Sequence, residues 1–335
     1  MTKKFLQITL LASAIAAVTG TANANIVTSI KPLGFIASSI ADGVTDTEVI
    51  VPAGASPHDY SLKPSDVQQL KSTGLLLWIG EDVDGFLAKS IKSIDGKKVI
   101  NISELEAIKP LLSKAAHHHH DGDEGENEHH HDHDKGSHQH EEHAHSGHQH
   151  EHEAHDHDHD HDGLSTNWHV WYSPAISQVV AQQVADKLTA QFPAQKERIA
   201  QNLAEFNHAL TAQGEKIQAQ LVPFKDKGFY VFHDAYGYFN DTYGLQQTGY
   251  FTINPLVAPG AKTLAIIKEE IAEHKVSCLF AEPQFTPKVI ESLSKGTGVH
   301  VGHLDPMGEK VALGKDSYAK FLQLTADSYA ECLSK

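Results

Sequence analysis

Histidine dominates the side chains of this chain that could do chemistry. The sequence holds 26 His in 335 residues, and 19 of them lie between His117 and His161. The run ends in four consecutive His-Asp pairs, in the stretch EAHDHDHDHDG. Neutral imidazole is a ligand suited to zinc, and histidine-rich tracts are typical of metal binding. The tract therefore indicates metal chemistry, either as the tight site or as an accessory to one.

The tract lacks a scaffold of its own. Residues 115–163 contain almost no apolar side chain, so we expect them to be disordered without metal. Between His117 and Gly163 there are 15 Asp or Glu and one Lys, which leaves only −2 of the net charge of −16 on the body. The body thus offers no basic field for nucleic acid. We expect weak accessory zinc sites at His117, His118, His119, His120, His155, His157, His159 and His161.

The body must therefore supply the scaffold of a tight site. Short apolar runs such as NIVTSI, TEVIVPAG, LLLWIG and KKVINI alternate with helical patterns such as PLGFIASSIADG, PSDVQQLKSTG and DGFLAKSIKSI. The alternation resumes after the tract with GFYVFH, LQQTGYF, VSCLFAEP and VHVGHL. This pattern predicts an α/β protein with two lobes, each built on a parallel sheet with helices on its faces.

A long helix separates the two alternations. Apolar residues recur with helical spacing from Ile199 to Leu221, which predicts one helix over residues 193–222. A coiled-coil segment has the same pattern, but a helix joining two lobes fits the alternation that resumes directly after it. We therefore assign residues 25–192 to the first lobe and 223–335 to the second.

Open α/β sheets bind ligands beyond the carboxyl ends of their strands, and this rule selects among the seven histidines of the body. His58 lies just past one strand, and His233 directly follows another. His169 lies where the tract returns to the body, and Asp305 directly follows the last strand. We predict that these residues meet in the cleft around one zinc, with the fourth ligand open between Asp305 and water.

Two aspartates directly follow predicted ligands. Asp59 and Asp234 are candidates to accept a hydrogen bond from an imidazole and orient the ring. Capping a local turn is the alternative role for each of them.

The N-terminus has the pattern of a secretory signal. Lys3 and Lys4 precede a short apolar core, and Ala22-Asn23-Ala24 fits the cleavage rule, so residues 1–24 are predicted to be a signal peptide. The apolar core is too short to span a membrane comfortably. The signal therefore predicts export to a bacterial periplasm. In that oxidising compartment Cys278 and Cys332 favour a disulfide, with two buried thiols as the alternative.

Seven segments together resemble the ZnuA family, the periplasmic zinc-binding proteins of bacterial ABC importers. They are KPLGFIASSIADGV, VPAGASPHDYSLKPSDV, LLLWIGEDVDGFL, HVWYSP, YVFHDAYGYF, NPLVAPGAKTL and LFAEPQF, and they cover essentially the whole mature chain. The resemblance implies two lobes joined by a rigid helix, a metal in the cleft and delivery to an inner-membrane permease. It also implies that the three cleft histidines are His58, His169 and His233.

The resemblance bears on two further features. A carboxylate at the end of the last strand in metal-binding relatives matches Asp305, and the family's disulfide matches Cys278 and Cys332. Some members carry an acidic residue just before the first histidine, where this chain has Pro57.

These features favour a monomeric zinc-capture protein without catalysis. A manganese-binding importer subunit, a zinc hydrolase and a metal-storage protein are the alternatives. The sequence has no H-E-x-x-H motif and no nucleophile elbow, which disfavours the hydrolase. We expect one tight cleft site for Zn²⁺ and weaker sites in the tract, which would raise the local zinc concentration.

Overall fold

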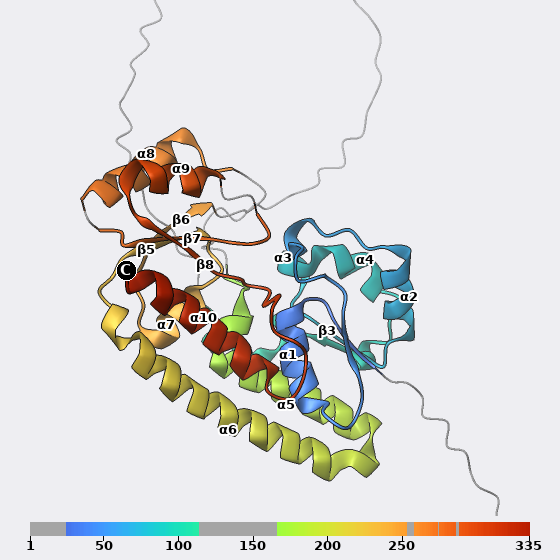
Figure 1. Ribbon diagram of the computed structural model, residues 1–335. Helices are drawn as coiled ribbons and strands as arrows, with labels where there is room; N and C mark the ends of the chain where they lie inside the picture. Colours follow the sequence, from blue (N-terminus) through green and yellow to red (C-terminus); the bar gives the residue numbers. More distant parts are fainter. Residues whose placement is uncertain (1–24, 114–165, 253–257, 274, 286–287) are drawn as a thin grey trace, which may run out of the picture.

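The structure is a computed structural model that describes residues 25–113, 166–252, 258–273, 275–285 and 288–335. The predicted signal peptide and the accessory histidines of the tract lie outside the described residues. The described part contains two four-stranded sheets with helices around each, as the alternating sequence pattern predicts (Figure 1). Within that part, no helix is both long and apolar enough to cross a membrane.

The first sheet has the strand order β2-β1-β3-β4, and all its pairs are parallel. Its strands are β1 (Ile26–Thr28), β2 (Thr47–Val49), β3 (Leu75–Trp78) and β4 (Val99–Asn101). The helices of this half are α1 (Lys31–Ile40), α2 (Pro64–Ser72), α3 (Glu81–Asp84), α4 (Ala88–Ile91) and α5 (Pro174–Gln191). Every residue of β3 is buried, as expected for a continuous apolar run in a parallel sheet.

The second sheet repeats the pattern with the order β6-β5-β7-β8, again all parallel. Its strands are β5 (Phe229–His233), β6 (Gln247–Thr252), β7 (Cys278–Ala281) and β8 (His300–His303). Its helices are α7 (Gly237–Tyr243), α8 (Ala261–Ala272), α9 (Lys288–Thr297) and α10 (Ser317–Leu333). Because the order reverses between β5 and β7, the crevice beyond their carboxyl ends is a topological switch point.

One predicted helix is interrupted. The segment DGFLAKSIKSI (84–94) starts at the last residue of α3 and continues as a 3₁₀ turn over Gly85–Leu87 and as α4, so it is not one continuous α-helix. Gly85 has poor helix propensity. The buried carboxylate of Asp84 also accepts hydrogen bonds from Ser29 Oγ at 2.7 Å and from the Ile79 amide at 2.8 Å. The backbone at Asp84 (φ −104°, ψ 35°) leaves the helical region, so the chain bends there.

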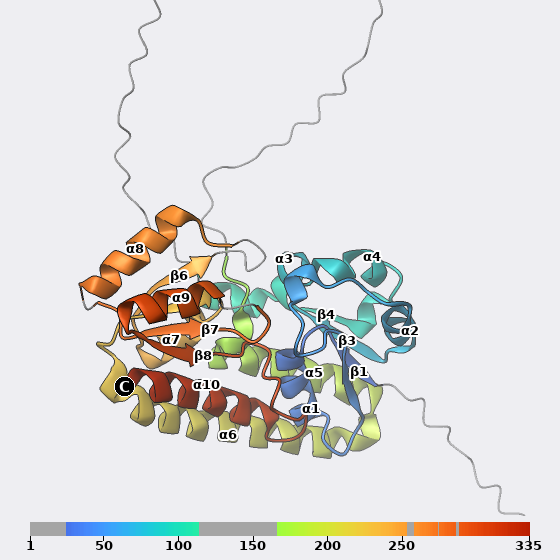
Figure 2. The same cartoon turned by 45° about the horizontal axis from the view of Figure 1, so that its top comes forward.

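The long helix is α6 (Lys196–Leu221), with 3₁₀ turns over Pro193–Gln195 and Val222–Phe224 at its ends. Its buried apolar stripe packs on α1, α5 and α10 of the same chain, which explains the pattern without a coiled-coil partner. In Figure 2, α6 and α10 run side by side beneath both sheets. The last helix of the chain therefore returns to contact α1, near the start of the first lobe.

The two cysteines form a disulfide, which excludes the alternative of free thiols. It joins Cys278 at the start of β7 to Cys332 near the end of α10, with 6.1 Å between the Cα atoms. The bridge ties α10 directly to the central part of the second sheet.

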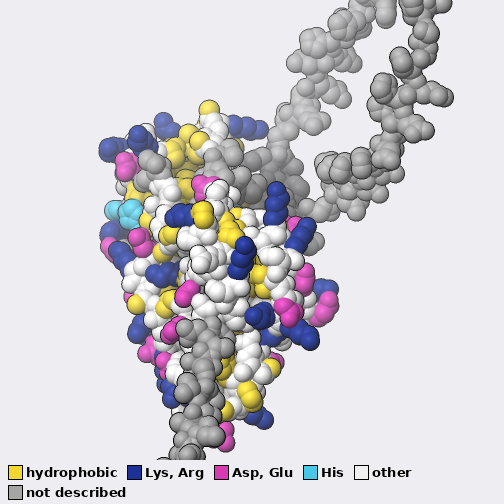
Figure 3. All heavy atoms as spheres, turned by 90° about the vertical axis from the view of Figure 1, so that its right-hand side faces the viewer, with side chains coloured by type: hydrophobic (Ala, Val, Ile, Leu, Met, Phe, Trp, Pro, Cys, Tyr) yellow, Lys and Arg dark blue, Asp and Glu magenta, His cyan; other side chains and the backbone are white. Residues whose placement is uncertain are grey.

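The surface of the first lobe carries charges of both signs. Figure 3 shows Lys and Arg side chains mixed with Asp and Glu on the face that looks away from the second lobe. Acidic and basic groups are interspersed there, with no broad field of one sign on that face.

Candidate metal centre

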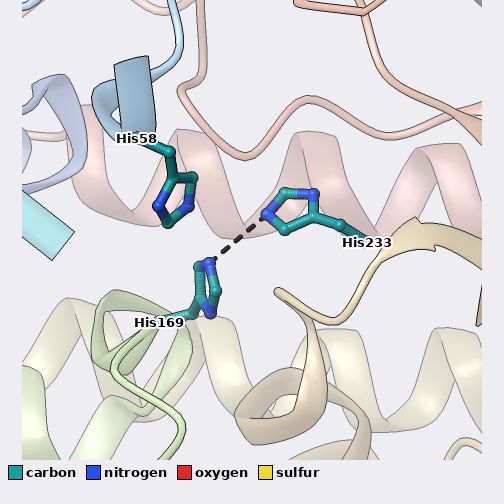
Figure 4. Close-up of side chains that lie close together, drawn as sticks. All are labelled: His58, His169 and His233. Carbon is teal, nitrogen blue, oxygen red and sulfur yellow. Dashed lines mark hydrogen bonds between the residues drawn. The ribbon is translucent and has the colours of Figure 1, made fainter. Parts of the chain in front are cut away.

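Three histidines from distant parts of the chain converge between the two sheets. The candidate ligand atoms of His58, His169 and His233 all lie within 4.8 Å of one another. Figure 4 shows the three rings pointing toward a common centre. The ring centroids are 5.8 Å apart for His58 and His169, 5.9 Å for His58 and His233, and 5.1 Å for His169 and His233.

Local structure fixes each histidine. His58 lies in the 3₁₀ turn η1 (Pro57–Asp59), where its amide donates to Ser56 Oγ at 3.3 Å. His169 precedes a second 3₁₀ turn, η6 (Val170–Tyr172), and its amide donates to Asn167 Oδ1 at 3.0 Å. His233 is the last residue of β5 and is buried.

Hydrogen bonds at Nδ1 set the tautomers of two rings. His233 Nδ1 lies 2.8 Å from both carboxylate oxygens of buried Glu282, and His169 Nδ1 lies 2.8 Å from Asn167 Oδ1. The Asn167 amide group donates to the Asp234 carbonyl at 3.2 Å, so its oxygen must face the ring. Both Nδ1 atoms are therefore donors, which leaves a lone pair on each Nε2.

The two lone pairs face each other. His233 Nε2 and His169 Nε2 are 3.3 Å apart, the contact drawn as a dashed line in Figure 4. Two nitrogens bound to one zinc at ~2.0–2.1 Å with a tetrahedral angle lie roughly 3.3–3.4 Å apart. Two lone pairs at this distance repel unless a cation lies between them, so the geometry fits a zinc ligand pair.

The environment of the histidines disfavours a proton as the cation between the Nε2 atoms of His169 and His233. Burial, and then the neighbouring imidazoles of His233 and His58, lower the pKa of His169 well below its usual value. Burial, and then His233, lower the pKa of His58 to about 4. These rings are thus neutral at pH 7, which is the form that binds a metal.

The remaining predicted site residues lie around this centre. Asp305 does not belong to the group of close ligand atoms, and its carboxylate accepts hydrogen bonds from Met307 N, Glu309 N and Gln284 Nε2. Asp59 is exposed. Asp234 is buried, and its carboxylate accepts a hydrogen bond from Gln247 at 3.1 Å.

Two residues that orient the rings were not predicted from the sequence. Glu282 and Asn167 are the hydrogen-bond partners of His233 and His169. Glu282 directly follows β7, the neighbour of β5, so the strand-end rule applied to every strand would have selected it. Asn167, two residues before His169, carries no such signal.

The walls of the site are mostly apolar. Trp171 packs edge-on against His169 with centroids 5.1 Å apart, and Phe285 packs edge-on against His233 at 6.2 Å. The three imidazoles share the pocket with Ser56, Pro57, Trp171, Gln284, Phe285, Pro306 and Met307. The cavity is about 10 Å³, about the size of one small ion or one water.

Two parallel-sheet lobes, a long helix beneath both and three imidazoles between them define the class of two-lobed metal-binding solute-binding proteins. A family model described as the periplasmic zinc-uptake complex component A, ZnuA, matches residues 26–332. The chain therefore belongs to the ZnuA family.

Individual members of the family are similar to this chain over nearly its full length. The chain is 73% identical to the high-affinity zinc uptake system protein ZnuA of Haemophilus influenzae, covering 99% of this chain and all of the relative. It is 54% identical to that of Haemophilus ducreyi, covering 98% and 99%. A crystal structure of ZnuA superposes with a TM-score of 0.69 at 21% identity, covering 92% of this chain and 98% of the other, which supports the fold.

Proposed function

We propose that this chain is a periplasmic zinc-capture protein that binds Zn²⁺ through His58, His169 and His233 and delivers it to an inner-membrane ABC permease. The observation that carries the proposal is the pair of Nε2 lone pairs 3.3 Å apart, each fixed by a hydrogen bond at Nδ1. Zinc is the preferred cargo over manganese because the ligand group is made of imidazoles, whereas Mn²⁺ favours oxygen ligands.

The finer parts of the proposal concern processing, oligomeric state, the tract, the lobe boundaries and the fourth ligand. Cleavage after Ala24 releases the mature protein into the periplasm, where it acts as a monomer. The tract supplies weaker accessory sites, among them His117–His120 and the histidines of the terminal repeat. The lobes divide at residues 192/193 and 222/223, and Asp305 or water completes the tight site.

Competitive chelator titration of purified protein tests the cleft site. His58→Ala should lower zinc affinity by more than a hundredfold, because it removes one of three ligands. Deletion of residues 117–162 should leave the tightest site intact and remove only weaker binding. His208→Ala, at an exposed histidine on α6, is the matched control and should bind zinc as the wild type does.

The same titration separates the alternatives. If the deletion loses the tightest site and His58→Ala retains it, the tightest zinc binds in the tract, and capture in the cleft is refuted. A preference for Mn²⁺ over Zn²⁺ in competition would reject zinc as the cargo.

A further inference from the structure

Gln284 occupies a junction between the metal pocket and both lobes. It follows Glu282 by two residues in the turn after β7, and it lines the pocket with the three histidines. Its Nε2 donates to the Ala53 carbonyl at 3.1 Å and to Asp305 Oδ1 at 3.0 Å. Ala53 belongs to the loop that leads to His58, so this amide links the loop of one proposed ligand to the turn that carries Glu282, the hydrogen-bond partner of His233.

The orientation of this amide is determined by its partners. Both groups on the Nε2 side, a carbonyl and a carboxylate, can only accept hydrogen bonds. Turning the amide over would place oxygen against oxygen at both contacts. The Gln284 Oε1 atom must therefore face the other way.

The amide oxygen is buried and has no hydrogen-bond partner among the described residues. A buried acceptor without a donor is destabilising and uncommon in folded proteins. Gln191 has the same pattern, with Nε2 donating to the Gly74 carbonyl at 2.9 Å and a buried, unpartnered Oε1. Gln191 lies at the end of α5 and does not line the metal pocket. Substituting it therefore shows the effect of losing such an amide away from the metal site.

We propose that Gln284 is a positioning residue of the zinc site, whose Oε1 accepts a hydrogen bond from a water that completes the zinc shell. The inference rests on the proposed zinc binding by the three histidines. Zinc takes four ligands, and a water bound to it is a strong hydrogen-bond donor. Gln284 lines the same pocket as the three histidines, so such a water would lie beside its side chain. The carboxylate of Asp305, the other candidate for this position, already accepts three hydrogen bonds.

The test compares the full-length wild type with Gln284→Met, which keeps the length of the side chain and removes the amide. Zinc affinity is measured by chelator competition, and Co²⁺ replaces zinc as a spectroscopic probe, since its visible absorption reports the number and type of ligands. Gln284→Met should lose about 10–100-fold in zinc affinity, the range for a lost outer hydrogen-bond partner, and should change the Co²⁺ spectrum. Gln191→Met should match the wild type in both measurements.

Gln284→Asn covers the case in which Gln284→Met folds poorly. It keeps an amide but withdraws it by one methylene, so it should also change the Co²⁺ spectrum. A loss of affinity with an unchanged spectrum would show that Gln284 only ties the loops together, and would overturn the proposal. Equal behaviour of Gln284→Met and Gln191→Met would overturn it as well. Failure of wild-type protein to bind zinc, or unchanged binding in His58→Ala, would instead refute the underlying zinc site.

Discussion

At the scale of single residues, the site depends on groups that do not touch the metal. Glu282 accepts hydrogen bonds from His233 Nδ1 and from the Tyr236 hydroxyl, the latter at 3.1 Å. The carboxylate holds the ring in the tautomer whose Nε2 can bind zinc, and its charge makes the imidazole a stronger ligand. Asn167 holds His169 in the same tautomer without a charge.

Replacing that carboxylate tests its contribution. Glu282→Gln keeps the shape but removes the charge, and its amide nitrogen cannot accept a hydrogen bond where a carboxylate oxygen does now. We expect zinc affinity to fall about 10–100-fold, measured by chelator competition. Glu106→Gln, at an exposed glutamate paired with Lys109, is the control and should leave affinity unchanged. Wild-type affinity in Glu282→Gln would mean that the carboxylate does not tune His233.

The lowered pKa of His58 predicts how binding depends on pH. Free imidazole gains a proton near ~6.5, whereas His58 does so at about 4. Between these values the cleft ring stays neutral while the histidines of the tract become charged. Zinc titrations at pH 7 and pH 5 should therefore show weak sites lost at pH 5 and the tight site retained.

The same shift has a consequence for stability. From pH 6.5 down toward 4, the unfolded chain binds a proton at His58 that the native chain does not. This group therefore makes the metal-free protein less stable as pH falls through that window. Urea unfolding of metal-free His58→Ala should show a weaker pH dependence than the wild type. An identical dependence in both proteins would contradict the assigned pKa.

At the scale of elements, much of the fold follows from local patterns. The apolar runs form strands such as β3, which is buried at every residue, and the 3.6-residue pattern forms α6, which buries one apolar stripe. The proposed ligands His58 and His233 could be predicted because parallel strands end at one edge of a sheet. His169, which no strand-end rule selects, was a candidate because it lies where the tract returns to the body, and the family resemblance then supported it.

Other features depend on contacts between distant segments, which local patterns do not encode. Glu282 meets His233 only because β7 pairs with β5, although the two residues are 49 positions apart. The break at Asp84 depends on a hydrogen bond to Ser29, 55 positions away. The packing of α10 on α1 joins opposite ends of the chain.

The disulfide between β7 and α10 should contribute measurably to stability. Cys278 and Cys332 are 54 residues apart, and the bridge lowers the conformational entropy of the unfolded chain. A Cys278→Ser, Cys332→Ser double variant should lose about 4 kcal/mol of unfolding free energy in urea titrations, on the loop-entropy model. Reduced wild type should behave like the variant. A loss below about 0.5 kcal/mol would show that packing of α10 on the sheet suffices without the bridge.

At the scale of the whole molecule, the metal site and the lobes are coupled. His58 comes from the first lobe and His233 from the second, while Lys31 Nζ donates across to the Glu309 carbonyl at 2.8 Å. A metal bound by residues of both lobes adds a cross-link that exists only in the folded chain. The free energy of zinc binding therefore contributes to the stability of the entire protein.

Metal removal tests this coupling. At free zinc 100-fold above the dissociation constant, the folded state should gain about 2.7 kcal/mol, so the melting temperature should rise with zinc and fall on adding a chelator. His58→Ala should lose most of this gain, because it removes one of the three proposed ligands and so weakens zinc binding, whereas deletion of residues 117–162 should keep it. Calorimetry of the three proteins with and without zinc provides the measurement. If the deletion loses the stabilisation and His58→Ala retains it, the tightest zinc binds in the tract and does not join the two lobes.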